Sequence, residues 1–394
     1  MKSITSLSAL SLIFAGVLLA ACNSQKSTQP DVYVAGCIEM PGDEVDVEVN
    51  SVSIFTGRDT TIVIQSKSKY YATVWKNGVA QKLTDGTNEA GARSVYVSGS
   101  DVYVAGYDGN VATVWKNGVA QNLTDGTYEA KANSVFVSGD DVYVVGLITM
   151  YEAGKEVEVT VNEYHQASGK TTIRKYMRKA DKYYVTVWKN GVAQNLTNET
   201  DWATAHSVFV SGNDVYVAGQ EKLVGKLWKN GVAQNLTDII PCSVFVSGND
   251  VYMAGSGRYT IKIEEHFPAI PYALIWKNGI VQRLTDEDIT ITESSNRENV
   301  EFSTASSIFV SGDDVYVLGS AGKMSGKSSS IILWKNGEAQ ILADGSIWDY
   351  ASVFVYDNDV YLAFNRILMK NGVAQNLEVD ENARRFQVSS VFVK

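Results

Sequence analysis

Residues 94–123 read SVYVSGSDVYVAGYDGNVATVWKNGVAQNL, and this stretch decides the fold. Its β-branched and aromatic residues fall into four short runs, at 94–98, 101–105, 111–115 and 119–123, which is typical of strands. Gly99-Ser100 separates the first two runs. Asn117-Gly118 separates the last two and is a strong signal for a type I′ hairpin. The stretch therefore predicts four antiparallel strands joined by short turns.

The same pattern recurs along the chain, and the clearest copies are 40 residues apart, as from Trp75 to Trp115. Trp-Lys-Asn-Gly begins at Trp75, Trp115, Trp188, Trp228, Trp276 and Trp334, and a seventh copy begins at Met369. The first strand recurs at Ser94, Ser134, Ser207, Ser243, Ser307, Ser352 and Ser390, and the second at Asp31, Asp101, Asp141, Asp214, Asp250, Asp314 and Asp359. A period near 40 with four strands per repeat predicts an all-β, seven-bladed β-propeller. We expect the motif tryptophans to pack between blades.

The two ends of the repeat region complete each other. The region begins with a second strand at Asp31 and ends with a first strand at Ser390, so neither end makes a whole blade. Pairing the C-terminal strand with the N-terminal blade closes the ring and removes exposed strand edges. The strand order resembles that of NHL-type and similar lipoprotein propellers. This resemblance covers residues 31–394 and implies architecture, with the first strand innermost, but no activity. The alternative is an open seven-unit solenoid.

The N-terminus differs in character from the repeats. Lys2 precedes an apolar run over 7–21, which is too short to span a membrane and is typical of a signal peptide. The run ends in Leu19-Ala20-Ala21-Cys22, which resembles a bacterial lipobox. The resemblance implies that residues 1–21 are removed, that Cys22 is acylated and that residues 22–30 form a tether. Acyl chains would then hold the protein on a membrane of the bacterial cell envelope, and Asn23 favours the outer membrane. An ordinary secretory signal is the alternative.

Composition limits the range of partners and bonds. The net charge of −10 argues against nucleic-acid binding, which favours a basic face. Cys37 and Cys242 are the cysteines outside the signal region. An exported pair could form a disulfide, but the repeat places the two in blades far apart, so we expect free thiols.

Among the copies, two kinds of connection vary in length: the one between the second and third strands, and the one from the fourth strand to the first strand of the next blade. Both lie on the same face of the propeller. The largest insertions, 37–70 and 147–183, both show alternating Glu/Asp and Val followed by a Lys-rich return, which predicts two long hairpins. Cross-strand charge pairs would help to hold their register. Their valine-bearing side either packs on the propeller or the sister hairpin, or binds another molecule. A shorter insertion, 256–272, is rich in aromatic residues and proline.

Two groups of residues are candidates for ligand binding. The residue before each innermost strand should rim the central channel, and it varies as Arg93, Asn133, His206, Cys242, Ser306, Ala351 and Ser389. Trp202 and Trp348 stand outside the repeated motif, in fourth-to-first loops with Tyr128, Phe302 and Tyr350. Exposed aromatic rings on a concave face suit stacking on sugars. The alternatives are a water-filled channel and packing of the rings between blades.

Catalytic signatures are absent from the sequence. The three histidines, His165, His206 and His266, lack the spacing of a metal site, and no cofactor motif occurs. We therefore expect no cofactor and no metal, and we favour a non-catalytic binding or scaffold lipoprotein that recognises a protein or glycan on the decorated face. The alternative is a polysaccharide lyase or hydrolase with its site in the central funnel. A third hypothesis is self-association through the hairpins.

Overall fold

The computed structural model describes residues 29–49, 62–165, 170–260, 269–285, 301–323, 329–347 and 350–394, with backbone alone for 43–49, 62–67, 152–165, 170–181 and 259–260. Met1–Pro30 and Asp31–Lys394 are separate compact units. The expected signal peptide and Cys22 lie outside the described residues. Within the described ranges there is no helix of the length and hydropathy that crossing a membrane requires.

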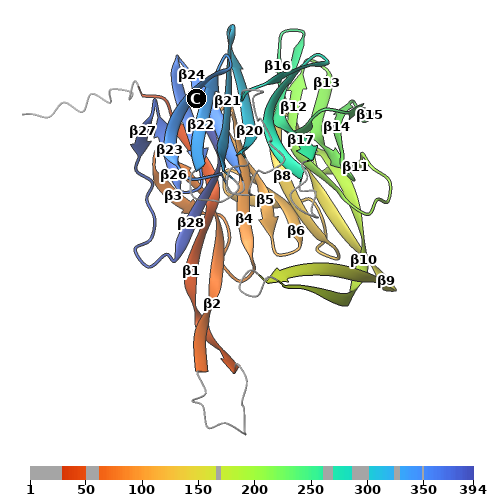
Figure 1. The fold of residues 1–394 in the computed structure, drawn as a ribbon. Coiled ribbons are helices and arrows are strands. Elements are labelled where there is room, and N and C mark those ends of the chain that lie inside the picture. The colour runs from red at the N-terminus through yellow and green to blue at the C-terminus, as the bar shows by residue number, and fades with distance from the viewer. Residues whose placement is uncertain are drawn as a thin grey trace, which may run out of the picture. The chain divides into compact units, whose positions relative to one another are not determined.

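Asp31–Lys394 forms seven four-stranded antiparallel sheets, which confirms the predicted seven-bladed propeller (Figure 1). Blade 1 contains β28 (Arg385–Val393), β1 (Val32–Val49), β2 (Ile62–Lys76) and β3 (Val79–Lys82). Blade 2 contains β4 (Ala90–Ser98), β5 (Asp101–Asp108), β6 (Val111–Lys116) and β7 (Val119–Asn122). Blade 3 contains β8 (Glu129–Ser138), β9 (Asp141–His165), β10 (Lys170–Lys189) and β11 (Val192–Asn195). Blade 4 contains β12 (Ala203–Ser211), β13 (Asp214–Glu221), β14 (Val224–Lys229) and β15 (Val232–Leu236).

The remaining three sheets follow the same order from the axis outward. Blade 5 contains β16 (Ile240–Ser247), β17 (Asp250–Thr260), β18 (Ala269–Lys277) and β19 (Ile280–Arg283). Blade 6 contains β20 (Glu301–Ser311), β21 (Asp314–Lys323), β22 (Ser329–Lys335) and β23 (Glu338–Asp344). Blade 7 contains β24 (Ala351–Tyr356), β25 (Asp359–Phe364), β26 (Ile367–Lys370) and β27 (Val373–Gln375).

Ring closure takes place in blade 1, as the offset of the repeat predicts. The last strand, β28, pairs with β1 from Val32↔Val393 to Glu39↔Arg385, and the two lie side by side in Figure 1. The backbones of Asp31 and Lys394 exchange two hydrogen bonds, of 2.8 and 3.0 Å. The two ends of the repeat region therefore meet where the other blades have a tight turn.

The hydrophobic core consists of seven clusters, one at each junction between neighbouring blades. In the cluster between blades 1 and 2, Trp115 packs with Ala35, Val74 and Val95. Each of the other six junctions holds one motif residue in the same way: Trp188, Trp228, Trp276, Trp334, Met369 and Trp75. The motif tryptophans therefore pack between blades, as predicted.

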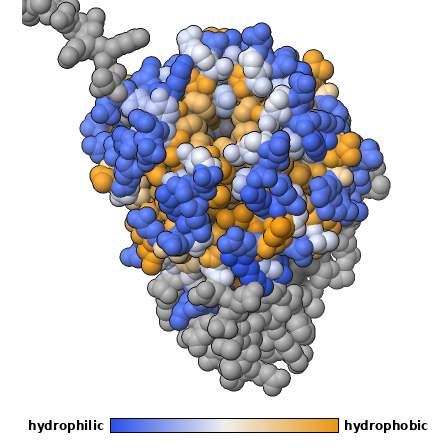
Figure 2. All heavy atoms as spheres, turned by 90° about the horizontal axis from the view of Figure 1, so that it is seen from above, coloured by the Kyte–Doolittle hydropathy of each residue, from blue (hydrophilic) through white to orange (hydrophobic). Residues whose placement is uncertain are grey.

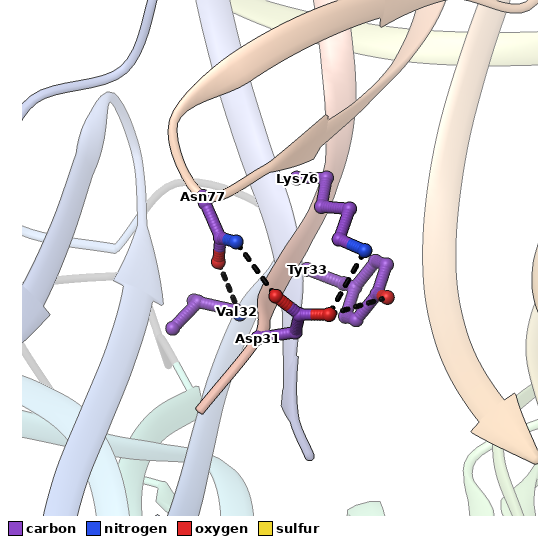
Figure 3. Close-up of polar contacts among 5 residues, drawn as sticks. All are labelled: Asp31, Val32, Tyr33, Lys76 and Asn77. Carbon is purple, nitrogen blue, oxygen red and sulfur yellow. Dashed lines mark hydrogen bonds and ion pairs between the residues drawn. The ribbon is translucent and has the colours of Figure 1, made fainter. Parts of the chain in front are cut away.

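The Lys-Asn pair of the motif fastens the third strand of each blade to the second. In blade 1, Lys76 forms an ion pair with Asp31 at 2.8 Å, and Asn77 donates to the same carboxylate at 2.7 Å (Figure 3). The Asn77 side-chain oxygen accepts the backbone N–H of Val32 at 2.8 Å. The Asp31 pKa is lowered because the carboxylate accepts these bonds from Lys76 and Asn77. Equivalent ion pairs join Asp101–Lys116, Asp141–Lys189, Asp214–Lys229, Asp250–Lys277, Asp314–Lys335 and Asp359–Lys370.

Replacing the motif asparagine separates two roles that it combines. Asn117 has φ 51° and Gly118 φ 82°, as the predicted type I′ turn requires, and the Asn117 side chain bonds Val102 N and Asp101. We expect Asn117→Ala to destabilise the protein by about 2 kcal/mol, since alanine loses both bonds and resists this backbone conformation. Asn117→Gly keeps the conformation and should cost roughly half as much. Urea denaturation measures both variants, and equal losses would contradict this division.

Both long insertions form the predicted hairpins, and the backbone register shows which residues lie opposite each other, while the charge pairing of their side chains stays a prediction. In blade 3, Glu156 lies opposite Lys179. In blade 1, by contrast, Asp46 lies opposite Gln65 and Glu48 opposite Val63. The β1–β2 hairpin runs away from the disc in Figure 1. What covers the valine-bearing sides depends on side chains outside those described.

Candidate functional site

The variable rim residues sit at β-bulges, which aim them at the central axis. In blade 2 the pairing runs Ala92↔Gly106 and then Ser94↔Ala105, so Arg93 has no partner across the sheet. The same irregularity leaves Asn133, His206, Cys242, Ser306 and Ser389 unpaired in their blades. A bulged residue bends its strand and re-aims its side chain. The rim positions therefore lie inside longer inner strands, whereas the sequence places them just before the strands.

One glycine in each bulged blade makes the bulge possible. A Cβ on Gly106 would lie 2.0 Å from the carbonyl oxygen of Gly91 on the neighbouring strand, which leaves no room for a side chain. Blade 7 has Phe364 at this position and pairs without a bulge. Ala351 consequently takes the paired position of Ala92, and its predicted equivalence to Arg93 is wrong.

The axis of the propeller holds a cavity of about 500 Å³. A first layer of its wall is the set of bulged residues, and a second layer is the hydroxyl ring, which we define as Ser94, Ser134, Ser207, Ser243, Ser307, Ser352 and Ser390. Each hydroxyl except that of Ser352 is seen to accept a backbone N–H from the next blade, as in Val135 N to Ser94 Oγ at 3.2 Å. Because the oxygen is the acceptor in these bonds, each of these hydroxyls keeps its hydrogen as a donor.

Seven aromatic rings close a further layer of the wall. Tyr96, Phe136, Phe209, Phe245, Phe309, Phe354 and Phe392 form a continuous circle, with neighbouring centroids 4.7–4.8 Å apart. Tilted ring pairs at this distance stabilise one another beyond simple burial. Figure 2 views the disc from the side away from the long hairpins and shows a hollow at its centre, bordered by hydrophobic residues. The cavity thus combines hydroxyl donors with an apolar aromatic layer.

Arg93 is the one charged side chain among the residues that line this cavity. Its guanidinium lies over the rings of Tyr107 and Tyr350, at 4.9 and 5.1 Å from their centroids. It donates a hydrogen bond to Oδ1 of Asn133, whose side-chain nitrogen in turn donates to the carbonyl oxygen of Ala205 at 2.6 Å. Stacking and hydrogen bonding from blades 2, 3, 4 and 7 therefore fix the plane of the guanidinium.

A second cavity, of about 360 Å³, opens beside the first and shares Arg93, Asn133, His206 and Tyr350 with it. Its outer wall carries Glu129, which is bound by Lys131 at 2.9 Å and by the Tyr151 hydroxyl at 3.0 Å. The Glu129 pKa is lowered, first by the hydrogen bond from Lys131. The base of the β9–β10 hairpin, with Tyr151 and Tyr183, thus forms one side of the site.

Burial keeps His206 neutral and the Cys242 thiol protonated at physiological pH. Desolvation lowers the pKa of His206 to about 4, and the positive charge of Arg93 adds to this effect. Desolvation raises the pKa of Cys242 to about 11. Neither Cys37 nor Cys242 forms a disulfide, as predicted. A neutral histidine offers one ring N–H as a donor and one nitrogen as an acceptor.

An NMR titration of the His206 ring should give a pKa of about 4. Arg93→Gln should raise that pKa but leave it below 6.5, because burial is the larger cause. In the unfolded chain the histidine pKa is near 6.5. Between about pH 4 and pH 6.5 the unfolded chain therefore binds more protons than the folded chain. Stability contributed by neutral His206 is therefore present above about pH 6.5 and is lost as the pH falls towards 4. His206→Asn should flatten this dependence, and an ordinary pKa in the wild type would contradict the prediction.

The other predicted site residues do not join this cluster. Tyr128 and Trp202 are exposed, at 38% and 39%, and line neither cavity, so their role in binding stays a prediction. Trp348 lies outside the described residues. Sequence reasoning missed Tyr107, Glu129, Lys131 and Tyr151. A signal was present, because Glu129 and Lys131 alternate with alanines ahead of Asn133, which is typical of an inner strand that begins before the rim residue. Within the described ranges, no group of His, Cys, Asp and Glu is arranged to hold a metal ion.

No family model matches this sequence, and no curated protein does. The fold is similar to that of Pyrococcus horikoshii acylaminoacyl peptidase, with 13% identity over 81% of this chain and 50% of the peptidase, at a TM-score of 0.44. Apo AztD from Citrobacter koseri matches with 8% identity over 93% and 98% of the two chains, at 0.34. Trypanosoma rangeli sialidase matches with 10% identity over 80% and 56%, at 0.32. The chain thus spans about half the length of the peptidase and the sialidase, and likeness at this level carries no inference about activity.

Proposed function

We propose that this protein is a lipid-anchored binding module of the bacterial cell envelope, which recognises a glycan through the decorated face of its propeller. The observation that carries the proposal is the axial cavity, where hydroxyl donors, one fixed guanidinium and a layer of aromatic rings line a space of about 500 Å³. Pockets for small ligands fall in this range of volume. Cys22 supplies the proposed anchor, and the outer membrane is the proposed location.

A sugar matches this lining better than a protein segment does. Sugar hydroxyls accept hydrogen bonds readily, and the apolar C–H face of a sugar ring can rest on aromatic side chains. A rigid ring of blades also holds these groups in place before the ligand arrives, which lowers the entropic cost of binding. The exposed Tyr128 and Trp202 offer further stacking surface on the loops around the site.

A polysaccharide lyase or hydrolase is the second candidate function. Glu129, Tyr151 and His206 all line the second cavity and are residue types that serve as general acids or bases. Glycoside hydrolysis, however, commonly requires two carboxyl groups facing one bond. Glu129 is the one carboxylate among the residues that line the two cavities. The lining therefore supports binding more than hydrolysis.

A soluble form comprising residues 31–394 is suited to the test, because it includes every described strand of the ring. We expect it to bind a subset of an envelope-glycan array and to leave the bound glycans uncleaved by mass spectrometry. Trp202→Ala and Tyr128→Ala should weaken this binding. Val119→Ala, which alters an exposed apolar residue on the outer strand β7, should not. Absence of glycan binding would overturn the proposal, and cleavage of a bound glycan would establish the enzymatic alternative.

A further inference from the structure

We infer that the axial cavity selects a sugar that carries a carboxylate, and that Arg93 is the residue that binds this carboxylate. The inference rests on the proposed glycan-binding function and adds the chemical class of the ligand.

The fold does not need a cation at this position. Five other blades have an uncharged residue at the equivalent place, namely Asn133, His206, Cys242, Ser306 and Ser389, blade 7 has no residue there, and all six form the same four strands. An arginine placed beside the axis loses part of its hydration, which is unfavourable unless a partner compensates for it. The one copy that carries a charge therefore points to a ligand rather than to a structural requirement.

Arg93 is held firmly but its hydrogen-bonding capacity is largely unused. A guanidinium has five N–H donors. Among the described residues, Asn133 is the acceptor seen on Arg93, and no carboxylate lies within ion-pair distance of it. Glu129 is close enough to feel its charge, but its oxygens are engaged by Lys131 and Tyr151. A planar guanidinium in contact with the rings of Tyr107 and Tyr350 can still offer paired N–H groups to an incoming carboxylate.

The wall around Arg93 also favours a negatively charged, hydroxyl-bearing ligand. No carboxylate lines the axial cavity, and the hydroxyl ring lines it with groups that can donate a hydrogen bond. Lys131, on the wall of the second cavity, adds a second positive charge near the opening, balanced by Glu129. A free carboxylate such as acetate would satisfy Arg93 alone. A uronic acid would also engage the serines and the aromatic layer.

The test compares two sugars that differ at one carbon. Methyl glucuronide carries a carboxylate where methyl glucoside carries a hydroxymethyl group. Isothermal titration of residues 31–394 should show the glucuronide or the matching galacturonide bound at least about 10-fold more tightly than its neutral counterpart, the effect of one hydrogen-bonded charge. Acetate should bind more weakly than either uronide. Equal affinity for charged and neutral sugars would overturn the inference and leave the proposed function standing, because neutral glycans would still bind.

Variants assign the effect to Arg93. Arg93→Gln should reduce uronide binding about 10-fold or more, while binding of the neutral sugar changes little. The uronide affinity of Arg93→Lys should lie between those of the wild type and Arg93→Gln, since lysine keeps the charge but not the paired donors. Arg283→Gln is the matched control, because Arg283 also stacks on a tyrosine, Tyr272 at 4.1 Å, but is exposed on the outer strand β19. Equal losses in Arg93→Gln and Arg283→Gln would overturn the assignment. The two-sugar comparison on the wild type decides the inference even if a variant fails to fold.

Discussion

Removal of residues 385–394 is expected to leave a chain that cannot form a stable monomeric propeller. The deletion removes β28, the innermost strand of blade 1, together with Lys394. Val388, Val391 and Val393 on this strand are exposed by 0%, 3% and 2%. Burial of one such side chain contributes about 1.5–3 kcal/mol, and a folded domain is stable by only about 5–15 kcal/mol. Loss of all three therefore approaches the whole net stability.

The same deletion damages the ring in two further ways. Strand β1 loses its inner partner and exposes an unpaired edge, which favours association with other chains. Glu39, which is only 8% exposed, loses its ion pair with Arg385, in which the two atoms lie 3.0 Å apart. Size-exclusion chromatography and urea denaturation followed by tryptophan fluorescence should show aggregates and no cooperative transition.

A circular permutant distinguishes the need for the strand from the need for the native ends. Six blades carry two residues between the first and second strands, such as Gly99 and Ser100. Joining Lys394 to Asp31 through Gly-Asp recreates this turn, and new ends between Gly248 and Asn249 move the closing contact to blade 5. We expect this permutant to unfold cooperatively, close to the midpoint of linear 31–394. A truncated chain with the wild-type transition would contradict the closure argument.

Repetition explains why so much of the architecture could be predicted. Seven copies of one strand pattern, offset at the two ends, admit few arrangements other than a ring closed by Ser390 and Asp31. The tryptophans could be placed because each copy repeats the same junction. Residues that are the same in all copies are the ones that the blade structure requires. The Asn-Gly turn is the clearest case, since Asn117 and Gly118 both adopt positive φ.

The site was harder to predict because its contacts are made between different blades. Arg93 contacts Tyr350, which precedes the first strand of blade 7 and is not at the aligned repeat position, and comparison of aligned positions does not reveal such a neighbour. Residues such as Glu129 belong to the site because the inner strands begin several residues before the repeated Ser-Val-Phe-Val segment. A signal for the bulge was nevertheless present. A glycine inside a strand indicates a bulge or a close backbone approach, and Gly106 has its counterpart in every copy except the one with Phe364.

Gly106→Ala is expected to cost about 3 kcal/mol of stability and to displace Arg93. The added Cβ would lie 2.0 Å from the Gly91 carbonyl oxygen, so the backbones of β4 and β5 must separate. Gly99→Asn in the same blade is the control. Gly99 has nothing within 4 Å of an added Cβ, and asparagine tolerates its φ of 56°. Urea denaturation should show a cost below about 1 kcal/mol for the control. Equal costs would mean that the bulge does not depend on this glycine.

A second change should reverse part of that loss. Blade 7 pairs without a bulge because it lacks one residue at the position of Arg93, which leaves room for the side chain of Phe364. Deletion of Arg93 in the Gly106→Ala chain removes the extra residue that pushes the Gly91 carbonyl towards position 106. The double variant should therefore be more stable than Gly106→Ala alone, although the deletion by itself removes a residue held by Asn133 and Tyr107. Such non-additivity is the mark of two positions that share one structural constraint. If the two losses simply added, the glycine and the bulged arginine would be independent, and the link between blade geometry and the site would fail.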